Sequence, residues 1–172
     1  MAYAAVKLMR SPKLKNPTMV LIADRVQLVQ QTYDQFRVTG MPALAVAKTT
    51  SELREFLATD QRGAIFTTVQ KFKGAGVLNT RANIIVLIDE AHRTQEGSLG
   101  QQLRAALPNA SFYGFTGTPI ADSDRNTYTL FGDPDDPGHA LNTYDSDRSI
   151  ADGMTVPMHV SARLVKFNID KE

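Results

Sequence analysis

The sequence contains no cysteine among its 172 residues. This absence excludes a disulfide scaffold, a zinc site built on thiolates and a cysteine nucleophile, and it fits a reducing compartment. The chain also lacks any run of about 18 consecutive apolar residues, the length needed to cross a bilayer. Its first ten residues are interrupted by Lys7 too early to form a secretory signal. We therefore expect a cytoplasmic protein that does not enter a membrane.

Neither sign of charge predominates, because 19 Lys and Arg residues balance 18 Asp and Glu residues and the formal net charge is +1. A basic nucleic-acid coat and an acidic solvating tail are both excluded as descriptions of the whole chain. The distribution is uneven: residues 1–81 carry twelve basic and five acidic groups, whereas residues 122–152 carry two and eight. A solvated surface and a DNA-facing one explain the basic surplus equally well. The acidic segment is typical of a loop-rich surface, and docking on a basic neighbouring domain is the alternative.

A third absence concerns the glycines. None of the 11 glycines is followed by lysine. The phosphate-binding P-loop, G-x-x-x-x-G-K-[ST], therefore has no match in this chain. In that loop the backbone amides surround the phosphates and the lysine reaches the terminal pair.

Short apolar runs that alternate with amphipathic segments predict the fold. The strongest run, NIIVLI at residues 83–88, is continuous rather than alternating, which is typical of a parallel strand buried on both faces. Parallel neighbours need crossover connections, and helices supply them. We therefore predict an α/β fold with a doubly wound, mostly parallel sheet. The predicted strands are 18–23, 43–46, 64–67, 83–88 and 110–115, and the predicted helices are 26–36, 49–59 and 99–107.

The chain changes character after residue 121, where glycines, prolines and aspartates become frequent. We expect irregular structure over 122–153, with a helical stretch at 145–152, and a strand-like segment over 156–169. The expected organisation is one domain over residues 1–155 and a strand-like connection over 156–172.

Two polar clusters follow predicted strands directly. Asp89-Glu90-Ala91-His92 follows NIIVLI, and Thr116-Gly117-Thr118-Pro119 follows SFYGF. Open α/β sheets bind ligands at the carboxyl ends of their strands. An acidic pair there can hold a hydrated magnesium ion through one carboxylate and orient a water through the other. The alternative, two acidic residues that merely end a strand, is disfavoured by the second cluster downstream.

Together these clusters resemble motifs II (DEAH) and III (T-G-T-P) of the motor core of superfamily 2 helicases and translocases. VLIADRVQLVQQ at 20–31 resembles motif Ia, and FTTVQKF at 66–72 resembles the next DNA-contacting motif. DEAHRTQ at 89–95, GFTGTPI at 114–120 and DGMTVP at 152–157 are similar to the restriction subunit of type I restriction-modification enzymes. The same sequences disfavour a DEAH-box RNA helicase. Similar motifs extend from about residue 16 to residue 160.

The resemblance implies a RecA-like fold of the P-loop NTPase class and an ATP-driven translocase of double-stranded DNA. Such a subunit also carries an endonuclease and works with modification and specificity subunits. With ATP and Mg²⁺ as cofactors, Asp89 would coordinate the magnesium of MgATP and Glu90 would activate the hydrolytic water. His92, Thr116, Gly117 and Thr118 would couple the nucleotide state to DNA. The residues implied to line the DNA path are Asp24, Arg25, Thr67, Thr68, Gln70 and Lys71.

The missing P-loop can be placed within this resemblance. Residues 4–8, AAVKL, are similar to the helix that leaves the P-loop in this family. We therefore expect a truncated first motor domain that begins just after the P-loop, ends before the second motor domain and has no ATP turnover of its own. The alternative is a catalytically inactive helicase-like module that binds DNA or protein. The presence of Glu90 favours the motor, because a module without catalysis does not need this acid.

Overall fold

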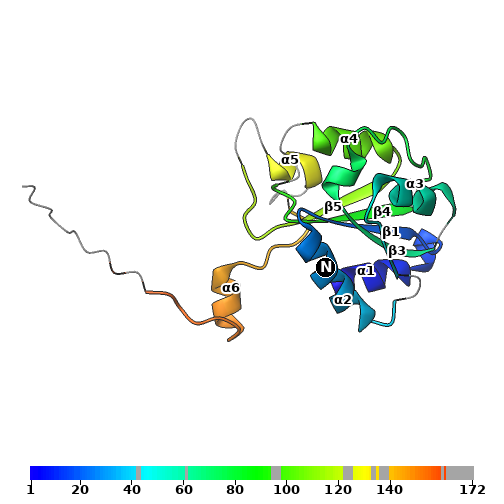
Figure 1. Ribbon diagram of the computed structural model, residues 1–172. Coiled ribbons are helices and arrows are strands. Elements are labelled where there is room, and N and C mark those ends of the chain that lie inside the picture. The colour runs from blue at the N-terminus through cyan, green and yellow to red at the C-terminus, as the bar shows by residue number, and fades with distance from the viewer. Residues whose placement is uncertain are drawn as a thin grey trace, which may run out of the picture. The chain divides into compact units, whose positions relative to one another are not determined.

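The computed structural model describes residues 1–41, 44–60, 62–93, 98–121, 126–132, 135, 140–159 and 161. These residues form two units, 1–140 and 141–172. The first unit is a sheet of five parallel strands with helices on both faces (Figure 1). The predicted doubly wound α/β fold is therefore confirmed.

The strand order is β2-β3-β1-β4-β5, and every pair is parallel. β1 is central, and Val20 lies in register with Ile65 of β3 and Val86 of β4. All residues of β1 and β3 are buried, as expected for parallel strands that are covered on both faces. The strands are β1 (Thr18–Ala23), β2 (Leu44–Val46), β3 (Gly63–Thr68), β4 (Ile84–Asp89) and β5 (Ser111–Phe115).

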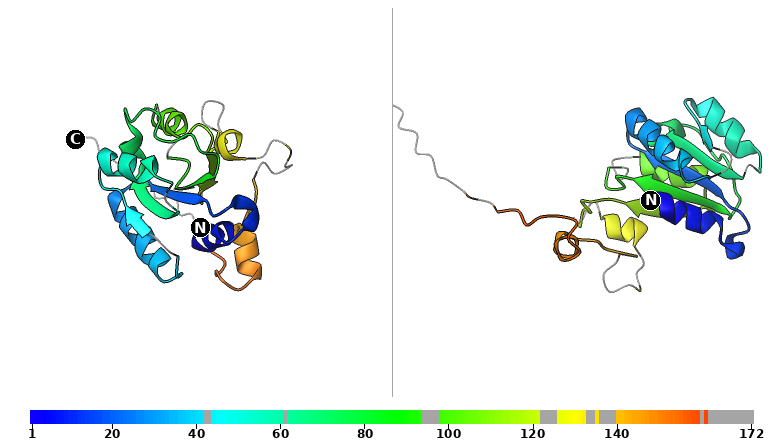
Figure 2. Two further views of the ribbon diagram at one scale, coloured as in Figure 1. Left: turned by 90° about the vertical axis from the view of Figure 1, so that its right-hand side faces the viewer. Right: turned by 90° about the horizontal axis from the view of Figure 1, so that it is seen from below.

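Helices cover the two faces of the sheet and give the first unit two cores. On one face, Met19 and Leu21 of β1 pack with buried residues of α1 and α2; on the other, Val20 and Ile22 pack with residues of α3, η2 and α4. The three layers are visible in Figures 1 and 2. Each fully buried aliphatic side chain contributes about 1.5–3 kcal/mol. These helices are α1 (Ala2–Met9), α2 (Val26–Arg37), α3 (Thr50–Ala58), α4 (Leu99–Ala106) and the 3₁₀ turns η1 (Pro12–Leu14) and η2 (Val69–Phe72).

The start of α3 shows how the local sequence sets a helix boundary. The Thr49 hydroxyl accepts the Glu52 N–H at 3.1 Å, and the Glu52 carboxylate accepts the Thr49 N–H at 3.3 Å. This reciprocal capping box satisfies two amide groups that the first helical turn leaves without partners.

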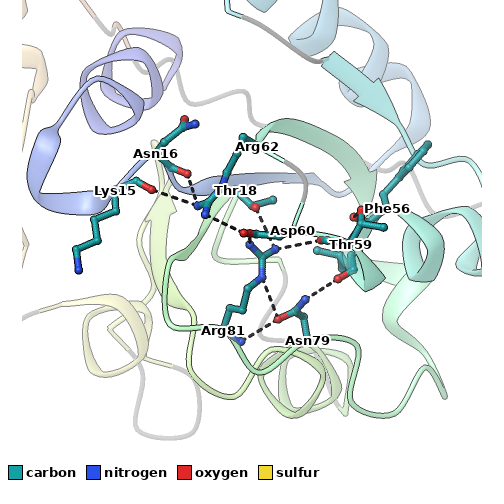
Figure 3. Close-up of polar contacts among 10 residues, drawn as sticks. Lys15, Asn16, Thr18, Phe56, Thr59, Asp60, Arg62, Asn79 and Arg81 are labelled. Atoms are coloured by element: carbon teal, nitrogen blue, oxygen red, sulfur yellow. Dashed lines mark hydrogen bonds and ion pairs between the residues drawn. The ribbon is translucent and has the colours of Figure 1, made fainter.

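A polar network, here named the amino-end clamp (Asp60, Arg62, Asn79 and Arg81), joins the segments at the amino ends of the strands (Figure 3). The Asp60 carboxylate pairs with Arg62 at 2.9 Å and also with Arg81. Arg81 donates further bonds to the Thr18 hydroxyl at 3.2 Å, at the start of β1, and to the Asn79 side chain at 3.4 Å. Burial lowers the pKa of the Arg81 guanidinium, so part of the energy of these bonds offsets its desolvation.

The other arginine of the amino-end clamp holds an unusual backbone. Lys15 and Asn16 have φ values of 52° and 55°, in the left-handed region that few residues other than glycine adopt. Arg62 donates to both of their carbonyl oxygens, at 3.2 Å and 2.5 Å. The guanidinium therefore stabilises the bend that leads the chain into β1.

A short helix, α5 (Thr127–Phe131), lies in the segment expected to be irregular, so that expectation was wrong for these residues. The Asn126 side chain caps its first turn by accepting the N–H groups of residues 128 and 129. Arg104 of α4 lies against the rings of Phe112 and Phe131, at 4.7 Å and 5.4 Å from their centroids. These contacts attach α5 to β5 and α4, and burial lowers the pKa of the Arg104 guanidinium.

The second unit contains the helix α6 (Ser146–Ala151), which confirms the helical stretch predicted at 145–152. Asp145 caps it by accepting the Arg148 N–H at 2.9 Å. Residues 156–159 and 161 are not in a strand. The remainder of the segment expected to be strand-like, 160 and 162–169, lies outside the described residues.

Candidate functional site

The structure brings the predicted site residues to one edge of the sheet. They follow, or end, four adjacent strands in the order β3-β1-β4-β5, and all four strands point in the same direction. The residues are Thr67, Thr68, Gln70 and Lys71 at β3, Asp24 and Arg25 at β1, Asp89, Glu90 and His92 at β4, and Thr116, Gly117 and Thr118 at β5.

Residues 89–93, here named the DEAH turn, reverse the chain immediately after β4. Asp89 is the last residue of the strand and lies in register with Phe115. Glu90 has φ +49°, a left-handed conformation that is costly for a glutamate. Its N–H donates to the Asp89 carboxylate at 3.1 Å, and its carbonyl accepts the Arg93 N–H at 2.8 Å. The tight turn leaves the Glu90 side chain 43% exposed beyond the end of the strand.

His92 connects the DEAH turn with the turn that follows β5. Its Nδ1 lies 2.7 Å from the Thr116 hydroxyl and 3.4 Å from the Thr118 hydroxyl. The same nitrogen lies 3.3 Å from a carboxylate oxygen of Glu90, and the ring is 17% exposed. The Thr116 hydroxyl also accepts the Thr118 N–H at 3.1 Å. One imidazole therefore contacts both polar clusters that the sequence singled out.

Asp89 is the residue suited to a magnesium ion. Its carboxylate accepts one N–H, from Glu90, and a carboxylate offers about four lone-pair sites. Magnesium in nucleotide sites is held by one or two carboxylates, phosphate oxygens and waters. Within the described ranges no group of three or more His, Asp or Glu side chains could hold a metal ion.

The residues implied to line the DNA path differ in accessibility. Thr67 is 1% exposed, and its hydroxyl donates to the Ala47 carbonyl at 3.2 Å inside the sheet. Thr68 is 5% exposed. Arg25, by contrast, is 65% exposed at the start of α2, Gln70 is exposed in η2, and Lys71 beside it is half-buried.

Arg93 is a residue to which the sequence assigned no contact. Its guanidinium lies 3.6 Å from the Asp24 carboxylate, which is also 3.6 Å from Arg25. The Asp24 carbonyl accepts a bond from the Gln70 side chain at 3.2 Å. The sequence signal for Arg93 was its position directly after DEAH, within DEAHRTQ at 89–95. Gln95, the last residue of DEAHRTQ, lies outside the described residues.

The profile of the SWI2/SNF2 ATPase family matches residues 1–172. The chain belongs to this family. Among curated relatives, the type I restriction enzyme HindI endonuclease subunit of Haemophilus influenzae is 38% identical over 98% of the chain. The type I restriction enzyme MjaIXP endonuclease subunit of Methanocaldococcus jannaschii is 37% identical over the whole chain. The resemblance to type I restriction subunits is therefore confirmed.

The chain spans only a part of these relatives, 18% of the Haemophilus protein and 16% of the Methanocaldococcus protein. In the part of the chain that the structure describes, no helix is both long and apolar enough to cross a membrane.

Proposed function

We propose that this chain belongs to the motor of a type I restriction endonuclease subunit, which hydrolyses ATP to move double-stranded DNA before cleavage. The motor would work in the cytoplasm with modification and specificity subunits. The observation that carries the proposal is the contact of His92 with both Glu90 and Thr116, at the carboxyl edge of the sheet. The family and the named relatives support the same function.

Asp89 and Glu90 have different roles in this proposal. Asp89 would hold Mg²⁺, which when bound to ATP neutralises charge that develops on the phosphates. Glu90 would orient the attacking water and accept its proton, a contribution of about 10²–10⁴ in rate for a positioned general base. The exposed carboxylate of Glu90 and its fixed backbone suit this role.

The accessible groups at β1 and β3 suit a DNA backbone. Arg25 and Lys71 are cationic and Gln70 is polar, so all three can contact phosphates. Phosphate contacts position a protein on DNA without reading its sequence. Contacts to phosphates alone fit a motor whose target sequence is recognised by a separate specificity subunit.

A glutamate-to-glutamine pair tests the catalytic assignment in the full-length subunit, assembled with its partners and supplied with duplex DNA. We expect Glu90→Gln to lower ATP turnover by about 10²-fold or more while MgATP binding persists, because the amide keeps the shape but cannot accept a proton. Glu55→Gln, on the exposed surface of α3, is the matched control and should leave turnover unchanged. Turnover by Glu90→Gln within twofold of wild type would show that Glu90 is not the base.

DNA binding by the 172-residue chain separates the motor from the inactive binding module. If about two phosphates are neutralised, the slope of log K against log salt is near -2. We therefore expect weak binding, without sequence preference and only at low salt, when fluorescence anisotropy is followed through a salt titration. Tight binding at physiological salt, or preference for one sequence, would instead favour the stand-alone module.

A further inference from the structure

Two consecutive residues of the DEAH turn contact opposite neighbours. β4 lies between β1 and β5 in the sheet. His92 contacts Thr116, after β5, whereas Arg93 pairs with Asp24, after β1. The backbone of Glu90 therefore lies next to links that lead to both adjacent strands.

Asp24 gathers groups from three adjacent strands. Its carboxylate pairs with Arg25 on its own loop and with Arg93 after β4, and its carbonyl accepts the bond from Gln70 after β3. The Asp24 side chain is 23% exposed. A carboxylate repels DNA phosphates, which makes Asp24 poorly suited to contact them. The contacts suit a residue that organises the cationic and polar groups around it.

We propose that Arg93 is a positioning residue that ties the DEAH turn to the loop after β1, so that a movement of Glu90 is transmitted to Arg25 and Gln70. The Arg93 N–H is bonded to the Glu90 carbonyl at 2.8 Å, so the two backbones move together. The parts of this inference that involve ATP and DNA rest on the proposed function, whereas the Arg93–Asp24 ion pair is a contact in the structure.

The strength of the Arg93–Asp24 ion pair suits a contact that forms and breaks during ATP hydrolysis. The Arg93 side chain is 49% exposed and its nitrogen is 3.6 Å from the Asp24 oxygen. Partly exposed pairs of this kind shift an equilibrium by a factor of about two to five. Such a link biases the position of the loop and can still open and close as the DEAH turn moves.

Hydrogen exchange in the 172-residue chain tests the link without any activity. We expect Asp24→Asn to raise the exchange rate of the Arg93 amide about two- to fivefold, because the turn loses the pair that holds it. The Ala91 amide, bonded to the Phe115 carbonyl at 3.0 Å, should keep its rate. Asp34→Asn, an exposed aspartate of α2, is the matched control. Unchanged exchange at Arg93 in Asp24→Asn would overturn the inference.

The second readout is the ratio of ATP turnover with and without duplex DNA in the full-length subunit. We expect Arg93→Gln and Asp24→Asn each to lower this ratio about fivefold, the lower end of usual coupling factors. The double variant should lose no more than either single one, because both remove the same pair. Arg93→Lys, which keeps the charge, should recover part of the ratio, and Asp34→Asn should not change it.

The outcomes separate the inference from the function on which it rests. A wild-type subunit whose turnover does not respond to DNA would overturn the proposed function, while the exchange measurement would still test the pair. A wild type that responds, with both single variants responding equally, would overturn the inference alone. Losses that add in the double variant would also overturn it, because the two residues would then act separately.

Discussion

The two ends of the central strands are built differently, although both are rich in charged groups. At the amino ends, Asp60 joins two arginines that also bind backbone or side-chain oxygens of neighbouring segments. At the carboxyl ends, the contacts of the carboxylates are longer, 3.3 Å for Glu90 with the His92 ring and 3.6 Å for the ion pair of Asp24 with Arg93. The comparison indicates that the amino end fixes the strands relative to one another, whereas the carboxyl end makes longer contacts around the candidate site.

Residues with left-handed backbone occur at both ends of the strands, but the hydrogen bonds to their carbonyl oxygens differ. The carbonyls of Lys15 and Asn16 are both bound by Arg62, which stabilises that conformation. The carbonyl of Glu90 accepts only a local bond, from the Arg93 amide, among those described. The conformational cost is therefore offset at the amino end and largely retained at the carboxyl end.

The largest effect on stability is expected from the amino-end clamp. Arg81→Ala should lower the free energy of unfolding by about 2 kcal/mol, because several hydrogen bonds to a charged, mostly buried group are lost together. Urea unfolding of the 172-residue chain measures the change, with Arg37→Ala on the exposed surface of α2 as the control. Arg81→Lys should recover only part of the loss, since an ammonium cannot reproduce the fork of bonds. An effect no larger than that of Arg37→Ala would mean that the clamp does not hold the strands.

A pair of glycines sharpens the comparison at the carboxyl end. A Cβ at Gly114 would lie 2.8 Å from the Ala91 Cβ and 2.9 Å from the Phe131 ring, whereas nothing lies within 4 Å of a Cβ at Gly117. Gly114→Ala should therefore destabilise the chain by about 1–2 kcal/mol through overpacking. Gly117→Ala should stay within about 0.5 kcal/mol of wild type, as a surface substitution does. Equal midpoints for the two variants in urea would show that α5 does not pack against β5.

The smallest effect concerns the backbone of Glu90 and has the opposite sign. Glu90→Gly should raise the free energy of unfolding by about 0.5 kcal/mol, because glycine relieves the left-handed conformation and loses some of that gain to its greater unfolded-state entropy. Glu55→Gly, in the middle of α3, should instead destabilise by about 1 kcal/mol. Thermal or urea unfolding compares the two. Destabilisation by Glu90→Gly would mean that position 90 carries no conformational cost.

Much of the sheet could be predicted from the sequence because its strands are continuous aliphatic runs. The run TMVLIA coincides with β1, and the prediction of 83–88 differs from β4 by one residue at each end. A strand buried on both faces has no solvent-facing side, so polar residues do not interrupt its aliphatic run. The helix α5 was missed because its five residues are stabilised by contacts of Phe131 with distant parts of the chain.

The sequence predicted which residues form the candidate site, but it did not predict their backbone conformation or their contacts. The positions of Asp89 and Thr116 directly after apolar runs indicated that they share one edge of the sheet. The left-handed φ of Glu90 could not be predicted, because glutamate does not favour that conformation. The pairing of Arg93 with Asp24 could not be predicted either, because the two residues are far apart in the sequence. The roles of these residues in ATP hydrolysis and DNA contact stay predictions.

The two edges of the sheet differ in a way that bears on handling the chain in solution. β2, at one edge, has three residues, and short edge strands offer little to pair with. β5, at the other, has five residues, and no strand among the described residues pairs with its outer side. An open strand of this kind exposes a row of amide and carbonyl groups to any chain that can add to it. A charged residue at the exposed Ser111 would oppose pairing by another chain along this strand.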